Sequence, residues 1–336
     1  MRKMIFLLGI AILITSCKKD DDDNKPDSNS IVGTWELVDY GGISWYNDTK
    51  FWIFTSDNQF YQLEEDNLGF RDLLNDSYQV VQNSILFDGD DAYNFSINNN
   101  TITFIDEDGA HLIFEKSGNI NPNDWVQEIN VGNVVFVVSG SNHSGICWTG
   151  QTLWCSFTHF NAGDALAEID IYNSGFITQI LAFQVGPLGF SNNYMLRGID
   201  GKIVLHNPSS GVVENEISLP NYSYFRGVCY DGNNIWFVAN NGQASQLVET
   251  DFNGSIITTI ENFKSVTDIT YYNGYLWILY YDLLFKFDTT NLKAVKTYRL
   301  IGLGMLSNGF TDGIEFINDT LWIMNGEGGF YNVALN

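Results

Sequence analysis

Positive charge is scarce in this sequence. Only 16 of its 336 residues are Lys or Arg, against 40 Asp and Glu, and the formal net charge is −24 at pH 7. A surface with such an excess of negative charge repels polyanions, and no basic stripe interrupts it. We therefore expect no nucleic-acid partner.

Metal-binding and catalytic motifs are also lacking. Neither the four histidines nor the cysteines have a spacing typical of a zinc site. The chain has no serine nucleophile elbow and no glycine-rich phosphate loop. An acidic run at residues 88–91 could attract calcium, but it lacks the other oxygen ligands of a recognised loop, so we interpret it as a turn. The sequence thus predicts no catalytic residue, metal or cofactor. Whether the protein is an enzyme stays open, with a binding role favoured.

Disulfides are not expected either. Beyond the N-terminal region the cysteines are Cys147, Cys155 and Cys229. Cys147 and Cys229 hold the same place in two repeats that are not neighbours, while Cys147 and Cys155 are predicted on opposite faces of a hairpin. Both placements are unfavourable for a bond that needs Cα atoms about 4.4–6.8 Å apart. We expect three buried thiols.

The apolar run at the N-terminus is too short to span a membrane. It has 11 residues, 4–14, whereas a spanning helix needs about 20, and two basic residues precede it. The aliphatic residue that ends the run, Ile14, is followed by two small residues and then Cys17, a pattern that resembles the lipobox of bacterial lipoproteins. The resemblance implies that residues 1–16 are a signal peptide and that Cys17 carries the lipid.

Residues 17–30 are polar and show no apolar periodicity, so they are predicted to form an acidic disordered tether. An acidic cluster directly after the lipid-bearing cysteine resembles the surface-export signal of Bacteroidetes-type lipoproteins; the alternative is a solvated spacer. Together these resemblances imply an outer-membrane lipoprotein. Its lipid would hold it to the membrane, with the folded part exposed at the cell surface or otherwise facing the periplasm.

Residues 31–117 alternate apolar and polar side chains in about eight short segments, which predicts antiparallel strands. Eight strands are enough to close a small barrel. The Gly33-Thr34-Trp35 opening, the aromatic residues around Phe54 and Phe60, and the closing segment 112–116 look like the lipocalin-like domains of Bacteroidetes lipoproteins. That resemblance implies that Trp35 closes the barrel floor.

Four further aromatic residues of this region could line a cavity, although aromatic strand residues are more often core. They are Trp45, Tyr46, Phe51 and Trp52.

Residues 118–336 repeat one phrase, in which a glycine and an apolar strand are followed by a tight turn and a Leu-Trp pair. The copies lie at residues 145–154, 186–195, 227–236, 268–277 and 313–322, and the second is degenerate. A period near 40 built of short strands predicts a β-propeller, so the predicted fold class is all-β, with a small barrel followed by a propeller. Five blades are favoured, with six as the alternative, and a strand from residues 124–139 is expected to complete the last blade.

The repeated tryptophans are expected to pack between blades, because a ligand would not need the same aromatic residue in every blade. They are Trp154, Trp236, Trp277 and Trp322.

The loops that lead into the innermost strands of a propeller gather at one mouth of its channel, where irregular loops on a rigid scaffold favour binding. The candidate ligand-binding residues there are His143, Tyr222, Tyr224, Arg226, Lys264, Asp268, Asn308 and Asp312. Arg226 and Lys264 could orient a polar ligand, and the tyrosines could stack on a sugar or peptide. Asp268 and Asp312 would suit acid–base chemistry if they lie close together. The alternative is that these are solvated charges and a structural aspartate at the repeat position.

The repeat half is similar to NHL-like propellers and to the glutaminyl cyclotransferase propellers, whose last repeat resembles residues 312–316 and 321–323. No glutamate can be placed in the catalytic motif of the latter family. We therefore expect a lipid-anchored envelope protein that captures an extracellular glycan, peptide or protein partner at the propeller mouth, in the barrel or in both. The alternative is a propeller enzyme of cyclotransferase-like or lyase type.

Overall fold

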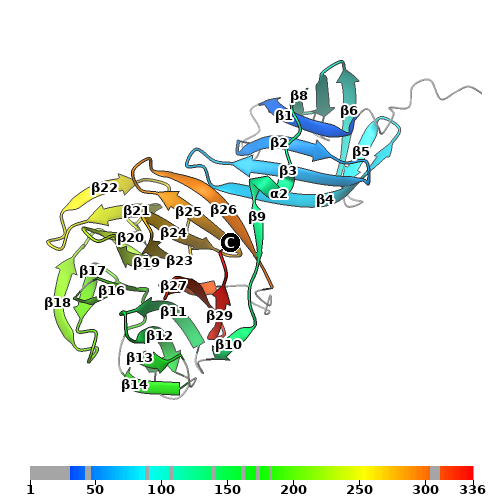
Figure 1. Ribbon diagram of the computed structural model, residues 1–336. Helices are drawn as coiled ribbons and strands as arrows, with labels where there is room; N and C mark the ends of the chain where they lie inside the picture. The colour runs from blue at the N-terminus through cyan, green and yellow to red at the C-terminus, as the bar shows by residue number, and fades with distance from the viewer. Residues whose placement is uncertain are drawn as a thin grey trace, which may run out of the picture. The chain divides into compact units, whose positions relative to one another are not determined.

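The computed structural model describes residues 31–41, 47–87, 91–105, 109–137, 141–159, 163–171, 175–181, 184–191, 193–302 and 311–335. The described ranges do not include residues 1–30 with Cys17, residues 88–90, Trp45, Tyr46 or Asn308, so the predictions for these residues lie outside the described part of the chain. Across the described ranges, no helix is both long enough and apolar enough to cross a bilayer. The chain divides into two compact units (Figure 1).

Eight consecutive strands form a closed barrel, as predicted for residues 31–117. They are β1 (Gly33–Asp39), β2 (Thr49–Phe54), β3 (Gln59–Glu65), β4 (Arg71–Val81), β5 (Ser84–Phe87), β6 (Asp91–Asn98), β7 (Thr101–Ile105) and β8 (His111–Lys116). Antiparallel pairing of β1 with β8 closes the ring. Asn58 and Asn99 adopt positive φ angles of 65° and 55° at the tight turns, a conformation that Asn tolerates well.

Aromatic side chains fill the barrel. Trp52 is 2 % exposed, and its ring centroid lies 5.2 Å from that of Phe60, 4.8 Å from Phe104 and 4.6 Å from Phe114. Trp35 is fully buried and donates its indole N–H to the carbonyl of Ile31 at 2.7 Å. The interpretation of the aromatic residues as core is confirmed for Trp52, and the interior is a packed core.

The repeats form five blades, so the favoured blade number is confirmed (Figure 1). Blade 1 consists of β11 (Ser141–Trp148), β12 (Leu153–His159), β13 (Gly163–Asp170) and β14 (Gly175–Leu181); blade 2 of β15 (Leu188–Phe190), β16 (Met195–Ile199), β17 (Lys202–His206) and β18 (Val213–Ser218); blade 3 of β19 (Ser223–Tyr230), β20 (Ile235–Asn240), β21 (Ser245–Thr250) and β22 (Ile256–Ile260). Blade 4 consists of β23 (Asp268–Tyr272), β24 (Tyr275–Tyr280), β25 (Leu283–Asp288) and β26 (Lys293–Ile301), and blade 5 of β27 (Thr311–Ile317), β28 (Thr320–Asn325) and β29 (Gly329–Val333).

The ring is closed by the segment that precedes blade 1. After the short helix α2 (Pro122–Trp125), strand β9 (Gln127–Asn130) pairs in parallel with β26, and β10 (Val134–Val137) pairs antiparallel with β29. The predicted closing strand within residues 124–139 is therefore present as β10. The parallel addition of β9 to blade 4 was not predicted.

Close backbone approach explains the repeated glycine. The innermost strands of neighbouring blades run so near each other that a Cβ atom on Gly145 would lie 2.5 Å from the amide nitrogen of Leu188. A Cβ atom on Gly227 would lie 2.6 Å from the amide nitrogen of Ile269. At these two positions glycine avoids the overlap without moving a backbone.

The degenerate second copy is aligned one residue later than the sequence suggested. Gly189 pairs with Leu196, as Cys147 pairs with Trp154 in blade 1, so Leu196 and not Met195 occupies the tryptophan position. The two hairpin turns agree, with an N–H to C=O bond from Ser191 to Tyr194 in blade 2 and an equivalent bond in blade 1. Loss of the sequence phrase in this copy hid a shift that the turn geometry reveals.

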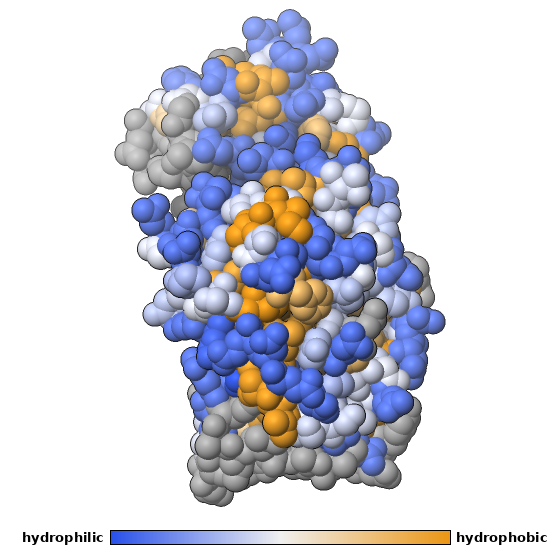
Figure 2. Space-filling model, turned by 90° about the vertical axis from the view of Figure 1, so that its left-hand side faces the viewer, coloured by the Kyte–Doolittle hydropathy of each residue, from blue (hydrophilic) through white to orange (hydrophobic). Residues whose placement is uncertain are grey.

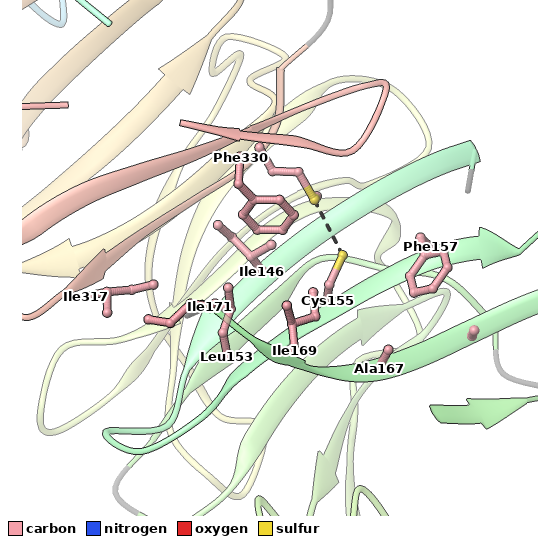
Figure 3. Packing of buried hydrophobic residues seen from close by; sticks show 11 residues of the cluster. Ile146, Leu153, Cys155, Phe157, Ala167, Ile169, Ile171, Ile317 and Phe330 are labelled. Carbon is pink, nitrogen blue, oxygen red and sulfur yellow. Dashed lines mark hydrogen bonds between the residues drawn. The ribbon is translucent and has the colours of Figure 1, made fainter. Parts of the chain in front are cut away.

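Three of the repeated tryptophans pack between blades, as predicted, and the fourth, Trp236, is buried. Trp154 shares a buried cluster with Met195 of blade 2, Trp277 contacts Phe316 of blade 5, and Trp322 is partly buried against the core that blades 1 and 5 share. In that core Cys155 lies 3.4 Å from the sulfur of Met324 (Figure 3). Cys147, Cys155 and Cys229 are buried free thiols, as expected.

Outer strands of the blades are more exposed than inner ones. Val213 in β18 and Ile257 in β22 are about half exposed, consistent with their places on the outer edges. Figure 2 shows one face of the molecule, where apolar clusters interrupt a largely polar surface.

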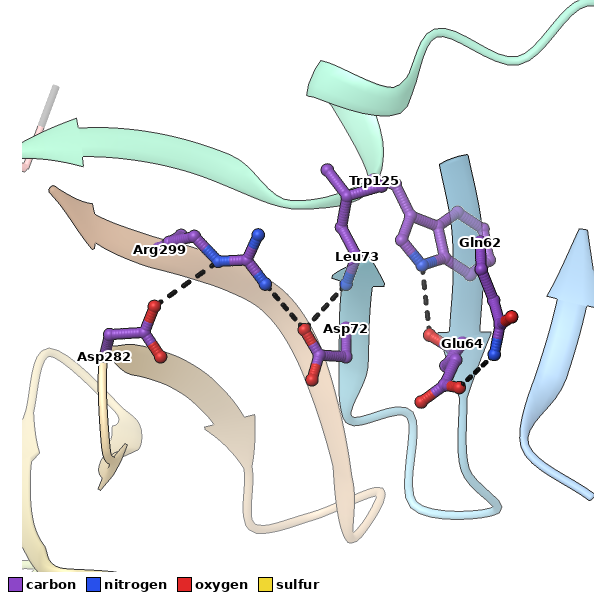
Figure 4. Close-up of polar contacts among 7 residues, drawn as sticks. All are labelled: Gln62, Glu64, Asp72, Leu73, Trp125, Asp282 and Arg299. Atoms are coloured by element: carbon purple, nitrogen blue, oxygen red, sulfur yellow. Dashed lines mark hydrogen bonds and ion pairs between the residues drawn. The ribbon is translucent and has the colours of Figure 1, made fainter. Parts of the chain in front are cut away.

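The second unit also contains residues 61–74, which comprise most of β3, the turn after it and the start of β4. Phe70 lies against Phe285, with ring centroids 4.6 Å apart. Arg299 of β26 binds the carboxylates of Asp72 at 2.7 Å and Asp282 at 3.5 Å (Figure 4). These contacts belong to the packing of blade 4 within this unit.

Candidate ligand-binding site at the propeller mouth

A cavity of about 330 Å³ lies where the chain enters the innermost strands. Each of the five blades contributes one lining residue from the same structural position. These residues are Ser144, Gly186, Arg226, Thr267 and Asp312. The other lining residues come from the same approaches and from the end of β16: His143, Gln184, Val185, Pro187, Gly198, Ile199, Asp200, Tyr224 and Phe225. The predicted mouth therefore coincides with a cavity.

Irregular strand pairing sets the direction of several of these side chains. The register between the first and second strand shifts just before the inner glycine in blade 1, between Ser141 and Gly145, and in blade 3, between Ser223 and Gly227. A smaller shift precedes Gly313 in blade 5. β-Bulges turn side chains away from the regular alternation and are frequent beside functional sites. Here they direct residues of three blades to the cavity.

Arg226 and Tyr224 come from the bulge of blade 3. Both are exposed, Tyr224 by 67 %. Tyr224 has a φ of 49°, a strained value for a residue other than glycine, and its amide donates to Asp200 Oδ1 at 2.9 Å. In the described ranges, Arg226 is the only one of four arginines without a hydrogen bond or ion pair to another residue.

Asp312 and His143 lie on the other side of the lining. Burial raises the pKa of the half-buried Asp312 carboxyl to about 7. No residue among those described forms a hydrogen bond or ion pair with this carboxyl. His143 is buried, with its ring stacked on Phe157 and Nδ1 3.4 Å from the carbonyl oxygen of Gly326. Asp312 is thus available to a ligand, and His143 is part of the wall.

Three of the predicted site residues do not line the cavity. Tyr222 packs edge-on against Phe237, with centroids 5.1 Å apart, in the core of blade 3. Lys264 binds Asp66 at 3.6 Å instead of facing the mouth, because residues 61–74 supply a nearer carboxylate. Asp268 is fully buried. Four predicted residues do meet at the cavity: His143, Tyr224, Arg226 and Asp312.

Asp268 occupies the position that glycine or proline holds in the other blades, namely Gly145, Pro187, Gly227 and Gly313. Its Oδ1 accepts the amide N–H of Ile269 at 2.8 Å, and its Oδ2 accepts that of Ile314 in blade 5 at 3.0 Å. Burial raises its pKa well above the usual range, and the two amide donors partly oppose this. The interpretation of a structural aspartate at the repeat position describes Asp268 better than a role in a pair with Asp312.

Glu315 is a polar residue that sequence reasoning missed. It occupies the place of Cys147 and Cys229 on the innermost strand of blade 5. Its carboxyl accepts from the Thr270 hydroxyl at 2.9 Å and from the Trp148 amide at 3.3 Å, which connects three blades. Burial raises its pKa to about 7. A glutamate within an apolar repeat strand was the available signal.

The cavity can therefore bind polar groups of both kinds. Arg226 can donate two parallel hydrogen bonds to an anion, and Asp312 can accept a hydrogen bond or carry a proton near neutral pH. Within the described ranges, no group of three or more His, Cys, Asp or Glu side chains is placed to hold a metal ion.

Comparison with known proteins shows the propeller fold and nothing finer. No family model and no curated protein matches this sequence. Glutaminyl cyclase of Myxococcus xanthus superposes with a TM-score of 0.51 at 12% identity, over 62% of this chain and 99% of that chain. Virginiamycin B lyase of Staphylococcus aureus gives a TM-score of 0.33 at 15% identity, over 92% of this chain and 97% of its own. The Pan2 WD40 domain of Neurospora crassa also gives 0.33, at 8% identity, over 92% and 91% of the two chains.

Proposed function

We propose that this protein is a lipid-anchored protein of the bacterial envelope that captures an extracellular glycan, peptide or protein partner at the propeller mouth. One observation carries the proposal. Two oppositely charged side chains that no described residue engages, Arg226 and Asp312, line the same cavity. Charged groups in proteins are normally paired unless solvent or a ligand satisfies them.

The dimensions of the cavity favour a small group over a flat partner surface. At about 330 Å³ it lies at the lower end of the range of about 300–1,000 Å³ for small-molecule sites. Such a space accommodates one sugar ring or the end of a peptide. A larger partner would therefore insert one terminal unit and leave the rest outside.

The barrel is not the preferred site. Trp52 and the aromatic rings around it fill the interior, whereas a binding barrel keeps a cavity. Ligand capture is therefore assigned to the propeller alone.

The anchor is tested separately from the site. Metabolic labelling with a fatty-acid analogue should mark the wild-type protein and leave Cys17→Ser unlabelled. Protease treatment of intact cells should then remove the labelled protein if it is displayed at the surface. Equal labelling of both forms would contradict lipid attachment at Cys17.

Ligand capture is tested by glycan and peptide arrays probed with the full chain. Arg226→Ala should lose the signal seen with the wild type. Lys293→Ala, which removes a charge from an exposed lysine of β26 away from the cavity, should retain it. Equal binding by wild type and Arg226→Ala would contradict the placement of the site.

An enzyme remains the second candidate because of one observation. Asp312 has a pKa near 7 in a cavity, which suits a general acid or base. The propeller of the Myxococcus xanthus glutaminyl cyclase makes cyclisation of an N-terminal glutamine the first reaction to try. Mass spectrometry would detect the loss of ammonia from a glutaminyl peptide, and Asp312→Asn should abolish it. Absence of turnover with intact ligand binding would favour capture without reaction.

A further inference from the structure

We propose that the ligand of the mouth is a sugar that carries a carboxylate, as uronic acids do. In this arrangement Arg226 binds the carboxylate, Tyr224 packs against the sugar ring, and Asp312 accepts a ring hydroxyl. The inference rests on the proposed function and names the chemical class of ligand for the same site.

Arg226 supplies the recognition of the acidic group. The other arginines of the described ranges have partners: Arg71 binds Glu65, Arg197 donates to the carbonyl of Gln184, and Arg299 binds two aspartates. In a chain with 40 acidic and 16 basic residues, carboxylates are plentiful enough to pair any exposed arginine. The unengaged guanidinium fork at the cavity matches a ligand carboxylate in charge and geometry.

Tyr224 supplies an aromatic face at the rim. Its ring is exposed although its backbone is held in a strained conformation by the bond from its amide to Asp200 Oδ1. Strain of this kind persists only where surrounding structure fixes it, and it clusters at ligand sites. An exposed ring with a polar hydroxyl suits a partner that is apolar on one face and polar at its edges, as a sugar ring is.

The remaining lining contains more polar than large apolar side chains. The polar ones, which offer hydroxyl, amide and carboxyl groups, are Ser144, Gln184, Asp200, Thr267 and Asp312, and the aliphatic ones are Val185, Pro187 and Ile199. The aromatic wall residue Phe225 is itself buried against Phe237. A peptide terminus also carries a carboxylate, but an inserted apolar side chain would face these polar groups, so the observations favour the sugar.

The test is calorimetric titration of the full chain with galacturonate and with galactose, which differ by the carboxylate. Galacturonate should bind at least tenfold more tightly. Arg226→Ala should bring the two dissociation constants within about threefold of each other, and Lys293→Ala should preserve the difference. Lowering the pH from 8 to 6 should strengthen galacturonate binding, because protonation of Asp312 removes a negative charge from a lining whose other charged or titratable groups are His143, Asp200 and Arg226.

The stacking residue has a matched control. Tyr281 is exposed, has a similar φ of 54° and does not line the cavity. Tyr224→Ala should weaken galacturonate binding about tenfold, and Tyr281→Ala should leave it unchanged.

The outcomes separate the inference from the proposed function. Equal affinity for both sugars overturns the acidic-sugar inference and leaves capture at the mouth standing. If the protein binds only peptides and Arg226→Ala loses that binding, the acidic-sugar inference is likewise overturned and capture at the mouth still stands. Absence of binding to any sugar or peptide overturns both.

Discussion

The barrel interior and the propeller axis are both centres of closed β-structures, yet they are filled in opposite ways. In the barrel, large aromatic rings converge on Trp52 and leave a packed core. In the propeller, glycines such as Gly145 and Gly189 let the inner strands of neighbouring blades approach closely. Between these strands lie the polar residues Asp268 and Glu315, and a cavity lies at one mouth.

The difference shows that the residues inside a closed β-structure determine whether it can hold a ligand. Inward aromatic residues stabilise the barrel through burial but leave no place for a ligand. Between the close inner strands of the propeller, the carboxylates of Asp268 and Glu315 accept hydrogen bonds from backbone amides. At the rim, Arg226 and Asp312 have no hydrogen-bond or ion-pair partner among the described residues, so a ligand can supply one.

The largest expected change in stability comes from placing a side chain between two inner strands of the propeller. In Gly189→Val the new Cβ would overlap the backbone of Val228, which cannot move without displacing blade 3. We expect a loss of more than about 4 kcal/mol in the free energy of unfolding. Hydrogen–deuterium exchange should rise across blades 2 and 3 and stay unchanged in β5 to β7.

Gly118→Val is the matched control, because a Cβ there meets nothing within 4 Å. It should change stability by less than about 0.5 kcal/mol. Comparable destabilisation by both substitutions would show that close approach at Gly189 is not the cause.

The next largest effect is expected from emptying the barrel. Trp52→Ala removes the ring at the centre of the aromatic core and should cost about 3–5 kcal/mol. Exchange should increase in strands β2 and β5 to β8, and binding at the propeller mouth should persist. Loss of ligand binding in this variant, with the propeller still protected, would assign the barrel a part in capture and weaken the contrast between the two regions.

Local patterns carried most of the fold prediction. Alternating strands and Asn turns gave the eight-stranded barrel, and the glycine-to-tryptophan phrase gave five blades, because both depend on residues close in sequence. The parallel pairing of β9 with β26 was missed, since it joins segments more than 150 residues apart. The one-residue shift of the degenerate second copy was missed because its hairpin turn has the same geometry as in blade 1 but lacks the repeated sequence motif.

The cavity gathers part of the predicted residue set. The rule that approaches to the inner strands gather at one mouth agrees with the lining positions of His143, Tyr224, Arg226 and Asp312, whose binding role stays a prediction. Lys264 lies outside the lining, and its partner Asp66 comes from the first part of the chain. Bulges have no reliable sequence signature, so the side chains they aim at the cavity could not be selected from their neighbours.

A smaller effect should appear in the pH dependence of stability, which is specific to the propeller axis. Glu315 has a pKa of about 7 when folded and 4.5 as its ordinary value, so the folded state holds the proton more tightly. Its contribution to stability is complete below about pH 4.5 and is lost as the pH rises through 7. Glu315→Gln should remove this decline, on the order of 1–3 kcal/mol between pH 4.5 and 8.

Chemical denaturation at pH 5 and pH 8 measures this change. Asp312→Asn is the companion variant, since the folded pKa of Asp312 is also about 7 and its contribution declines in the same direction from 3.8 upward. If Glu315→Gln shows the same decline as the wild type, Glu315 does not titrate in this range.

The smallest effect separates stability from binding within the propeller. Tyr224→Gly relieves a φ of 49° and should raise the free energy of unfolding by about 0.5–1 kcal/mol, although the flexible glycine offsets part of the gain in the unfolded chain. Tyr281→Gly, at a φ of 54°, should give a similar gain. Only Tyr224→Gly should also weaken ligand binding, because its ring lies at the cavity. A stabilised Tyr224→Gly protein with full affinity would mean that the strain at this position does not serve the ligand.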